Sequence, residues 1–102
     1  MKEIEELKNC FIEKLAPVRI YLFGSFAEGR QTEDSDFDFY IVVDDYMKNI
    51  IAETQRAYKS IRDIKKRSVD IVVGSRKRFE ERKTIPSLES EVDKKGVLLY
   101  AR

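Results

Sequence analysis

The chain contains no histidine and only one cysteine. Without histidine, zinc sites with imidazole ligands and all acid–base catalysis by histidine are excluded. The single Cys10 excludes an internal disulfide and fits a reducing cytoplasm. We therefore expect a cytoplasmic protein whose fold depends on its hydrophobic core and not on disulfides.

Long apolar runs are also absent. No segment approaches the ~20 residues that a membrane-spanning helix needs. Residues 1–6 contain no uncharged stretch that could serve as a signal sequence. The formal net charge is +1, so no overall field favours nucleic acid or a membrane surface. We expect no membrane partner, and nucleic acid is a poor candidate as a partner.

The composition indicates one small globular domain over residues 1–102. Hydrophobic residues make up 42% of the chain and charged residues 38%, which indicates a folded domain with a highly charged surface. The hydrophobic pattern, with Pro17 and Gly96 as boundaries, predicts helices over residues 2–15, 25–29, 46–66 and 86–95. Runs of β-branched and aromatic residues predict strands over 18–23, 36–43, 69–73 and 97–100. Residues 76–83 are charged and have no clear pattern. The expected fold is α/β, a small mixed sheet flanked by helices.

Three aspartates stand where strands should be apolar. Asp36 and Asp38 open the second predicted strand, and Asp70 lies inside the third. Buried carboxylates are costly unless a cation pairs with them. The pair Gly24-Ser25 follows the first strand and forms a turn that could hold phosphate. Together these residues suggest a site for magnesium and a nucleotide.

Strand geometry allows these residues to meet at one edge of a sheet. Spacing of two puts Asp36 and Asp38 on the same face of a strand. For Gly24 to lie near them, the first two strands must run antiparallel. Asp70 joins them only if the third strand runs parallel to the second, and the helix over 46–66 is long enough for that crossover.

Magnesium prefers hard oxygen ligands, usually a few carboxylates with phosphate oxygens and water. Asp36 and Asp38 could hold or bridge two such ions, which would clamp the attacking and leaving oxygens of an in-line displacement. Asp70 could complete the metal site or accept the proton of the attacking hydroxyl. Gly24 allows the backbone to approach a ligand closely, and Ser25 offers a hydroxyl and an N–H to phosphate.

Each feature also has a purely structural interpretation. A Gly-Ser pair at a strand end is an ordinary turn, and an Asp-x-Asp pair at a strand start could be a solvated edge or a capping loop. Asp70 could pair with a neighbouring arginine. The basic runs 65–67 and 76–78 are expected to be solvated. Among the tyrosines, we expect a core position for Tyr21, Tyr40 and Tyr58 and exposure for Tyr46 and Tyr100.

The segment Gly24-Ser-Phe-Ala-Glu-Gly29, followed after five residues by Ser35-Asp-Phe-Asp38 and Tyr-Ile-Val-Val, resembles the signature of the DNA polymerase β-like nucleotidyltransferase superfamily. The size and the ending Gly-Val-Leu-Leu-Tyr resemble its minimal nucleotidyltransferases from bacteria and archaea. The resemblance covers about residues 4–100. It implies that Asp36, Asp38 and Asp70 bind Mg²⁺, for which Mn²⁺ can substitute. It further implies that Gly24 and Ser25 bind the phosphates of a nucleoside triphosphate, expected to be ATP.

The resemblance implies two functional classes. The first is an enzyme that transfers a nucleoside monophosphate, AMP by expectation, to a hydroxyl of a protein or small molecule. Minimal members are often encoded beside a small all-helical HEPN protein, act as its antitoxin, and in some cases transfer AMP to its tyrosine. The second class is a binding-only antitoxin that neutralises such a partner without catalysis. A third, an enzyme that extends nucleic acid, is disfavoured by the neutral charge.

Overall fold

The computed structural model describes residues 1–102 as an α/β domain of four strands and five helices. The strands are β1 (Arg19–Phe23), β2 (Phe37–Val43), β3 (Val69–Ser75) and β4 (Val97–Ala101). The helices are α1 (Lys2–Leu15), α2 (Ser25–Glu28), α3 (Ile50–Ile61), α4 (Arg76–Arg82) and α5 (Leu88–Lys95). The predicted fold class is confirmed.

Local signals in the sequence fix most helix ends. The side chains of Asn49, Ser75 and Ser87 each accept a hydrogen bond from a backbone N–H of the first turn of α3, α4 and α5 respectively. Such N-caps satisfy donors that a helix leaves unpaired. Helix α1 ends with Ala16 in a left-handed conformation, one residue before Pro17. Pro17 cannot continue the helix because it has no backbone N–H to donate.

The four strands form one mixed sheet in the order β3-β2-β1-β4. Strand β1 runs antiparallel to both β2 and β4, and β2 runs parallel to β3. Helix α3 lies in the connection between the two parallel strands, as predicted. Strand β2 is internal, which agrees with its continuous apolar run from Phe39 to Val43.

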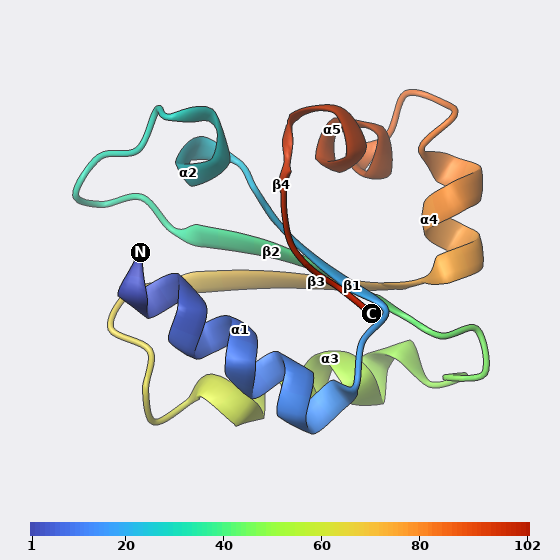
Figure 1. Ribbon diagram of the computed structural model, residues 1–102, viewed down its shortest axis with the longest axis horizontal. Helices are drawn as coiled ribbons and strands as arrows, with labels where there is room; N and C mark the ends of the chain where they lie inside the picture. Colours follow the sequence, from blue (N-terminus) through green and yellow to red (C-terminus); the bar gives the residue numbers. More distant parts are fainter.

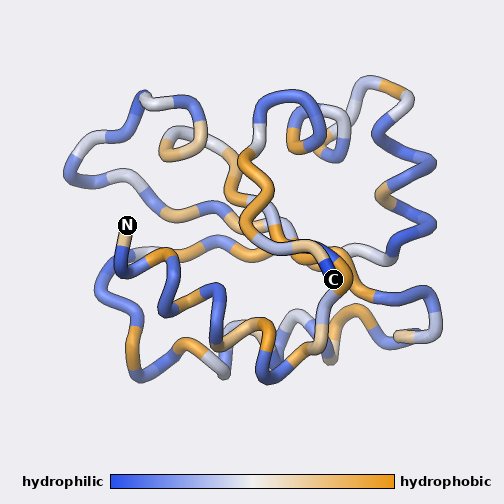
Figure 2. The backbone as a smooth tube through the Cα atoms, viewed as in Figure 1, coloured by the Kyte–Doolittle hydropathy of each residue, from blue (hydrophilic) through white to orange (hydrophobic).

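Helices cover both faces of the sheet (Figure 1). Helices α1 and α3 lie on one face, where the larger core cluster forms, and α4 and α5 lie on the other. The short helix α2 lies at the end of β1, and its Phe26 and Ala27 pack against the larger cluster. Alternation along β2 sends Phe37 and Phe39 to the α1/α3 face. Tyr40 and Val42 instead belong to a second cluster with Phe79 of α4. Figure 2 shows hydrophobic residues concentrated in the strands, and hydrophilic residues on α4 and the loop after α2.

The helix predicted over 46–66 is shorter in the structure. It begins at Ile50 because Asn49 caps it, and it ends at Ile61. The apolar stripe that suggested a longer helix is also wider than the buried face, since the side chain of Ile51 is 72% exposed. Tyr58 is likewise exposed, contrary to prediction, and its hydroxyl accepts a hydrogen bond from Ile71 N at the open edge of β3.

Three smaller differences concern the second half of the chain. Strand β3 continues to Ser75, and the charged segment after it is helix α4. The last helix begins at Leu88, after its cap Ser87, and not at Pro86. Tyr100 is half-buried against the core, contrary to the predicted exposure, whereas Tyr21 and Tyr40 are buried and Tyr46 is exposed as predicted. None of the five helices combines the length and apolar character needed to cross a membrane.

Candidate active site

Strand register brings the three predicted aspartates to the same edge of the sheet. Asp38 is the direct partner of Asp70 in the parallel pair β2–β3. Asp36 lies two residues before Asp38, immediately before β2 begins. On the other side of β2, Asp38 is paired with Phe23, the last residue before the Gly24-Ser25 turn. All five predicted site residues therefore lie at one end of three adjacent strands.

Gly24 lies in close contact with Asp38. Its φ is +75°, a conformation that side chains other than glycine rarely adopt. A Cβ atom added at Gly24 would also overlap the carboxylate of Asp38. Two independent reasons therefore favour glycine here: the positive φ of the backbone, and the lack of space for a side chain beside the Asp38 carboxylate. The turn after β1 continues into the short helix α2, whose first residue is Ser25.

The carboxylates at this edge have no cationic partner. No ion pair in the structure includes Asp36, Asp38 or Asp70, so the structural alternative in which an arginine neutralises Asp70 is wrong. Burial, and then repulsion from Asp70 and from Asp36, raises the pKa of Asp38 from 3.8 to about 6. The cluster stores electrostatic repulsion that a bound cation would relieve.

The family model "Polymerase beta, Nucleotidyltransferase" matches residues 5–102. The chain belongs to this nucleotidyltransferase family. No curated protein sequence matches it.

Solved structures show the same fold. A Sulfolobus solfataricus protein named as a nucleotidyltransferase superposes with a TM-score of 0.63 at 20% identity, over 99% of this chain and 79% of that one. A toxin–antitoxin complex with AMP-PNP gives 0.56 at 24% identity, over 99% and 73% of the two chains. A mutant of the toxin–antitoxin complex MntA–HpeT gives 0.55 at 20% identity, over 100% and 75%. At these identities the likeness concerns the fold.

The donor set of this nucleotidyltransferase suits a hard divalent cation, because it consists of three carboxylates with mutual repulsion. Asp36 and Asp38 are half-buried and Asp70 is exposed. In the described conformation, however, no three acidic side chains are close enough together to hold a metal ion. Magnesium binding by Asp36, Asp38 and Asp70 therefore stays a prediction, in which these side chains would have to turn toward the cation.

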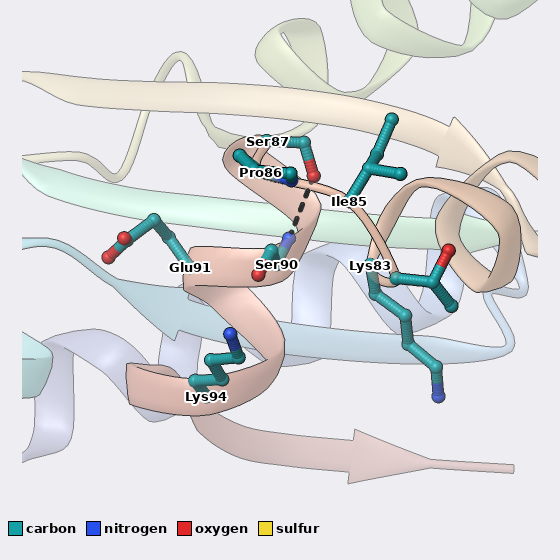
Figure 3. Close-up of a pocket in the computed structure, with 8 residues that line it drawn as sticks. Lys83, Ile85, Pro86, Ser87, Ser90, Glu91 and Lys94 are labelled. Carbon is teal, nitrogen blue, oxygen red and sulfur yellow. Dashed lines mark hydrogen bonds between the residues drawn. The ribbon is translucent and has the colours of Figure 1, made fainter.

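The site is an open edge and not an enclosed pocket. The structure has two pockets, of about 290 and 250 Å³, and neither is lined by a predicted site residue. The first is lined by residues 83–87, which connect α4 to α5, and by α5 itself; there Ser87 accepts a hydrogen bond from Ser90 N (Figure 3). The second lies at the N-terminus of α1. A nucleotide at the acid edge would consequently be bound on a surface that a partner could complete.

Sequence reasoning missed the surroundings of two charged residues, the buried Glu89 and the half-buried Arg67. Glu89 of α5 accepts a hydrogen bond from Tyr40 Oη at 2.7 Å, and it pairs with Arg82 at 3.1 Å and Arg78 at 3.6 Å. Its spacing of three from the buried Val92 is the one signal that could have placed it on the inner face of α5.

Arg67 is the second missed residue, and it corrects the prediction that the run 65–67 is solvated. Its side chain is 28% exposed, and its guanidinium lies against the rings of Phe26 and Phe37. Its neighbour Lys66 is exposed, as predicted. Nothing in the local pattern distinguishes the two residues, because the aromatic partners come from distant parts of the chain.

Proposed function

We propose that the protein catalyses magnesium-dependent transfer of a nucleoside monophosphate, AMP from ATP, to a hydroxyl of a protein or small molecule. One observation carries the proposal: on a nucleotidyltransferase fold, Asp36, Asp38 and Asp70 lie at one sheet edge without a cation, and Asp38 lies directly beside Gly24. We further propose that the acceptor belongs to a small helical HEPN-type partner, which the chain would neutralise as an antitoxin in the cytoplasm.

The residues of the edge divide into two roles. Gly24 and Ser25 would bind the phosphates, since a glycine backbone can approach a ligand closely and the Ser25 hydroxyl can donate to a phosphate oxygen. Asp36 and Asp38 would hold the cation. When bound, magnesium would neutralise negative charge on the phosphates and on the displaced oxygen. Asp70, the exposed acid, would complete the metal site or accept the proton of an incoming hydroxyl.

The partner is proposed from the structural neighbours. Two of the similar solved structures are toxin–antitoxin complexes, and one of these contains AMP-PNP. The toxin partners and the AMP-PNP belong to those neighbouring proteins. In this chain, the openness of the acid edge supports the idea, because an acceptor carried by another protein needs free access to Asp70.

A second candidate is a binding-only antitoxin. It is favoured by one observation, namely that no three acidic side chains are preformed as a metal site. In this case the protein would bind its helical partner tightly and transfer nothing.

The deciding experiment is transfer of labelled AMP from ATP to the protein encoded by the neighbouring gene, followed by mass spectrometry of that protein. Asp70→Asn should reduce transfer by at least about 100-fold, the range for removal of an acid–base group. The variant should still fold and bind the partner. Asp63→Asn changes an exposed aspartate that lies two residues after α3 and has no ion pair; it is the matched control and should transfer normally. Full transfer by Asp70→Asn would remove its catalytic role, and tight binding without transfer by the wild type would support the second candidate.

A further inference from the structure

Arg67 lies between α3 and β3 and contacts three separate parts of the chain. Its guanidinium carbon is 4.7 Å from the ring centre of Phe37 and 5.2 Å from that of Phe26. The two rings are 4.6 Å apart and inclined by 58°. A guanidinium nitrogen also approaches Glu3 Oε1 of α1 at 3.5 Å. One side chain thus connects the start of α1, helix α2 and the start of β2.

Each aromatic contact is adjacent to a residue of the candidate site. Phe26 follows Ser25, and Phe37 lies between Asp36 and Asp38. Because side chains alternate along a strand, Phe37 packs on the α1/α3 face while the two aspartates point away from that face. The backbone makes the same connection, since Phe37 N donates to the carbonyl of Ser68, the residue after Arg67.

The contacts of Arg67 with the two aromatic rings, more than its ion pair with Glu3, hold the Arg67 side chain in place. The Nε atom of Arg67 and the Oε2 atom of Glu3 are both buried without a hydrogen-bond partner, so the ion pair is poorly completed. The flat guanidinium, in contrast, lies within stacking distance of two rings, a contact that lysine reproduces badly. A side chain held mainly by two rings fixes the orientation of both rings.

We propose that Arg67 is a positioning residue that sets α2, and with it Ser25, relative to the acid pair on β2. Arg67 does this from the opposite face of the sheet, through Phe26 and Phe37, and touches no substrate. The proposal deepens the nucleotidyl transfer proposed above and rests on it for its functional consequence. Without the guanidinium between them, the Phe26 and Phe37 rings would shift relative to each other, and the distance between the phosphate-binding turn and the acids would change with them.

The test compares Arg67→Lys, which keeps the charge, with two controls. Lys66→Met changes the exposed neighbour, and Glu3→Gln removes the ion pair but leaves the stack. In Arg67→Lys we expect the backbone amide signals of Gly24, Ser25 and Asp38 to shift in an NMR spectrum of the ligand-free protein. We also expect affinity for ATP with magnesium to fall about tenfold, as for residues that orient a binding site from behind. Both controls should leave these signals and the affinity unchanged.

Unchanged amide signals at Gly24 and Ser25 in Arg67→Lys would overturn the proposal, and so would shifted signals with unaltered ATP affinity. If Arg67→Lys failed to fold, Phe26→Leu would repeat the test by removing a ring while keeping an apolar side chain. A wild type that binds no ATP would instead refute the proposed function. The amide signals alone would then decide whether Arg67 positions the turn.

Discussion

Two carboxylates on the same side of the sheet have opposite environments. Glu89 is the more buried, with a side chain only 4% exposed, yet it is surrounded by donors from Tyr40, Arg82 and Arg78. Burial alone would raise the pKa of Glu89, but the hydrogen bonds and the arginines outweigh it and lower that pKa. Asp38 is half-buried and faces two other acids, and its pKa is raised to about 6.

The contrast shows what the fold has and has not neutralised. Near α4 and α5, it supplies a hydroxyl and two arginines to a single acid, as expected of a structural contact. At the open edge it supplies no cation to three acids, although 20 lysines and arginines are available in the chain. Neighbouring carboxylates without a cation, whose mutual repulsion raises a pKa, are what a site for an external cation requires.

Matched removal of charge tests this contrast most strongly. Glu89→Gln should lower the free energy of unfolding by about 2–4 kcal/mol, because Arg82 loses its partner and the hydrogen bond of Tyr40 weakens. Asp38→Asn should leave the stability unchanged or raise it at pH 7 without metal, because it removes repulsion. Urea denaturation of both variants measures the difference, and equal losses would mean that both acids are structural.

Magnesium should act on the acid cluster alone. At ten times its dissociation constant, the ion should stabilise the wild type by about 1.4 kcal/mol through binding to the folded state. The melting temperature of Glu89→Gln should rise by a similar increment from its lower starting value. A double variant, Asp36→Asn with Asp38→Asn, should show no such rise with either Mg²⁺ or Mn²⁺. The same rise in the double variant would place the metal elsewhere.

The two acids should also give opposite pH dependences. The raised pKa of Asp38 means that the folded state binds a proton more readily than the unfolded state. Without metal, its contribution to stability should therefore decrease as the pH rises from about 4 to 6 and stay constant above that range. The lowered pKa of Glu89 has the reverse effect, so its stabilisation is lost as the pH falls through that pKa. Thermal unfolding of Asp38→Asn should lack the decrease between pH 4 and 6, and a wild-type profile in this variant would contradict the assignment.

Much of the fold follows from local pattern and from connection length. The length of the 44–68 connection permits a parallel pairing of β2 and β3, and the structure has that pairing, with Asp38 beside Asp70. The expected antiparallel pairing of β1 and β2, which a meeting of the Gly24 turn with the acids requires, is also present. These features depend on residues close together in the sequence or on the period of a strand.

What the sequence could not predict depends on neighbours from distant segments. Arg67 and Lys66 are both cations after a helix, and only the approach of Phe26 and Phe37 buries one of them. Glu89 looks like a solvated helix residue until Tyr40 and the arginines of α4 surround it. Ile51 continues an apolar stripe, yet no element covers it. Pattern indicates which face is apolar, and the assembled structure decides how much of that face is covered.

Ser25→Ala should have the smallest effect of these variants, and it tests the acid edge through its affinity for ATP. The variant removes one hydroxyl donor, so affinity for ATP with magnesium should fall by about 1 kcal/mol, or roughly fivefold. Folding should be little affected, because Ser25 is half-buried and its hydroxyl makes no hydrogen bond within the protein. Titration calorimetry of wild type and variant measures the change.

Ser90→Ala is the matched control, since Ser90 lies on α5 in the pocket away from the acid edge. If both variants bound ATP as the wild type does, Ser25 would have no part in phosphate binding. The turn would then act only through Gly24, whose missing side chain leaves room for the Asp38 carboxylate.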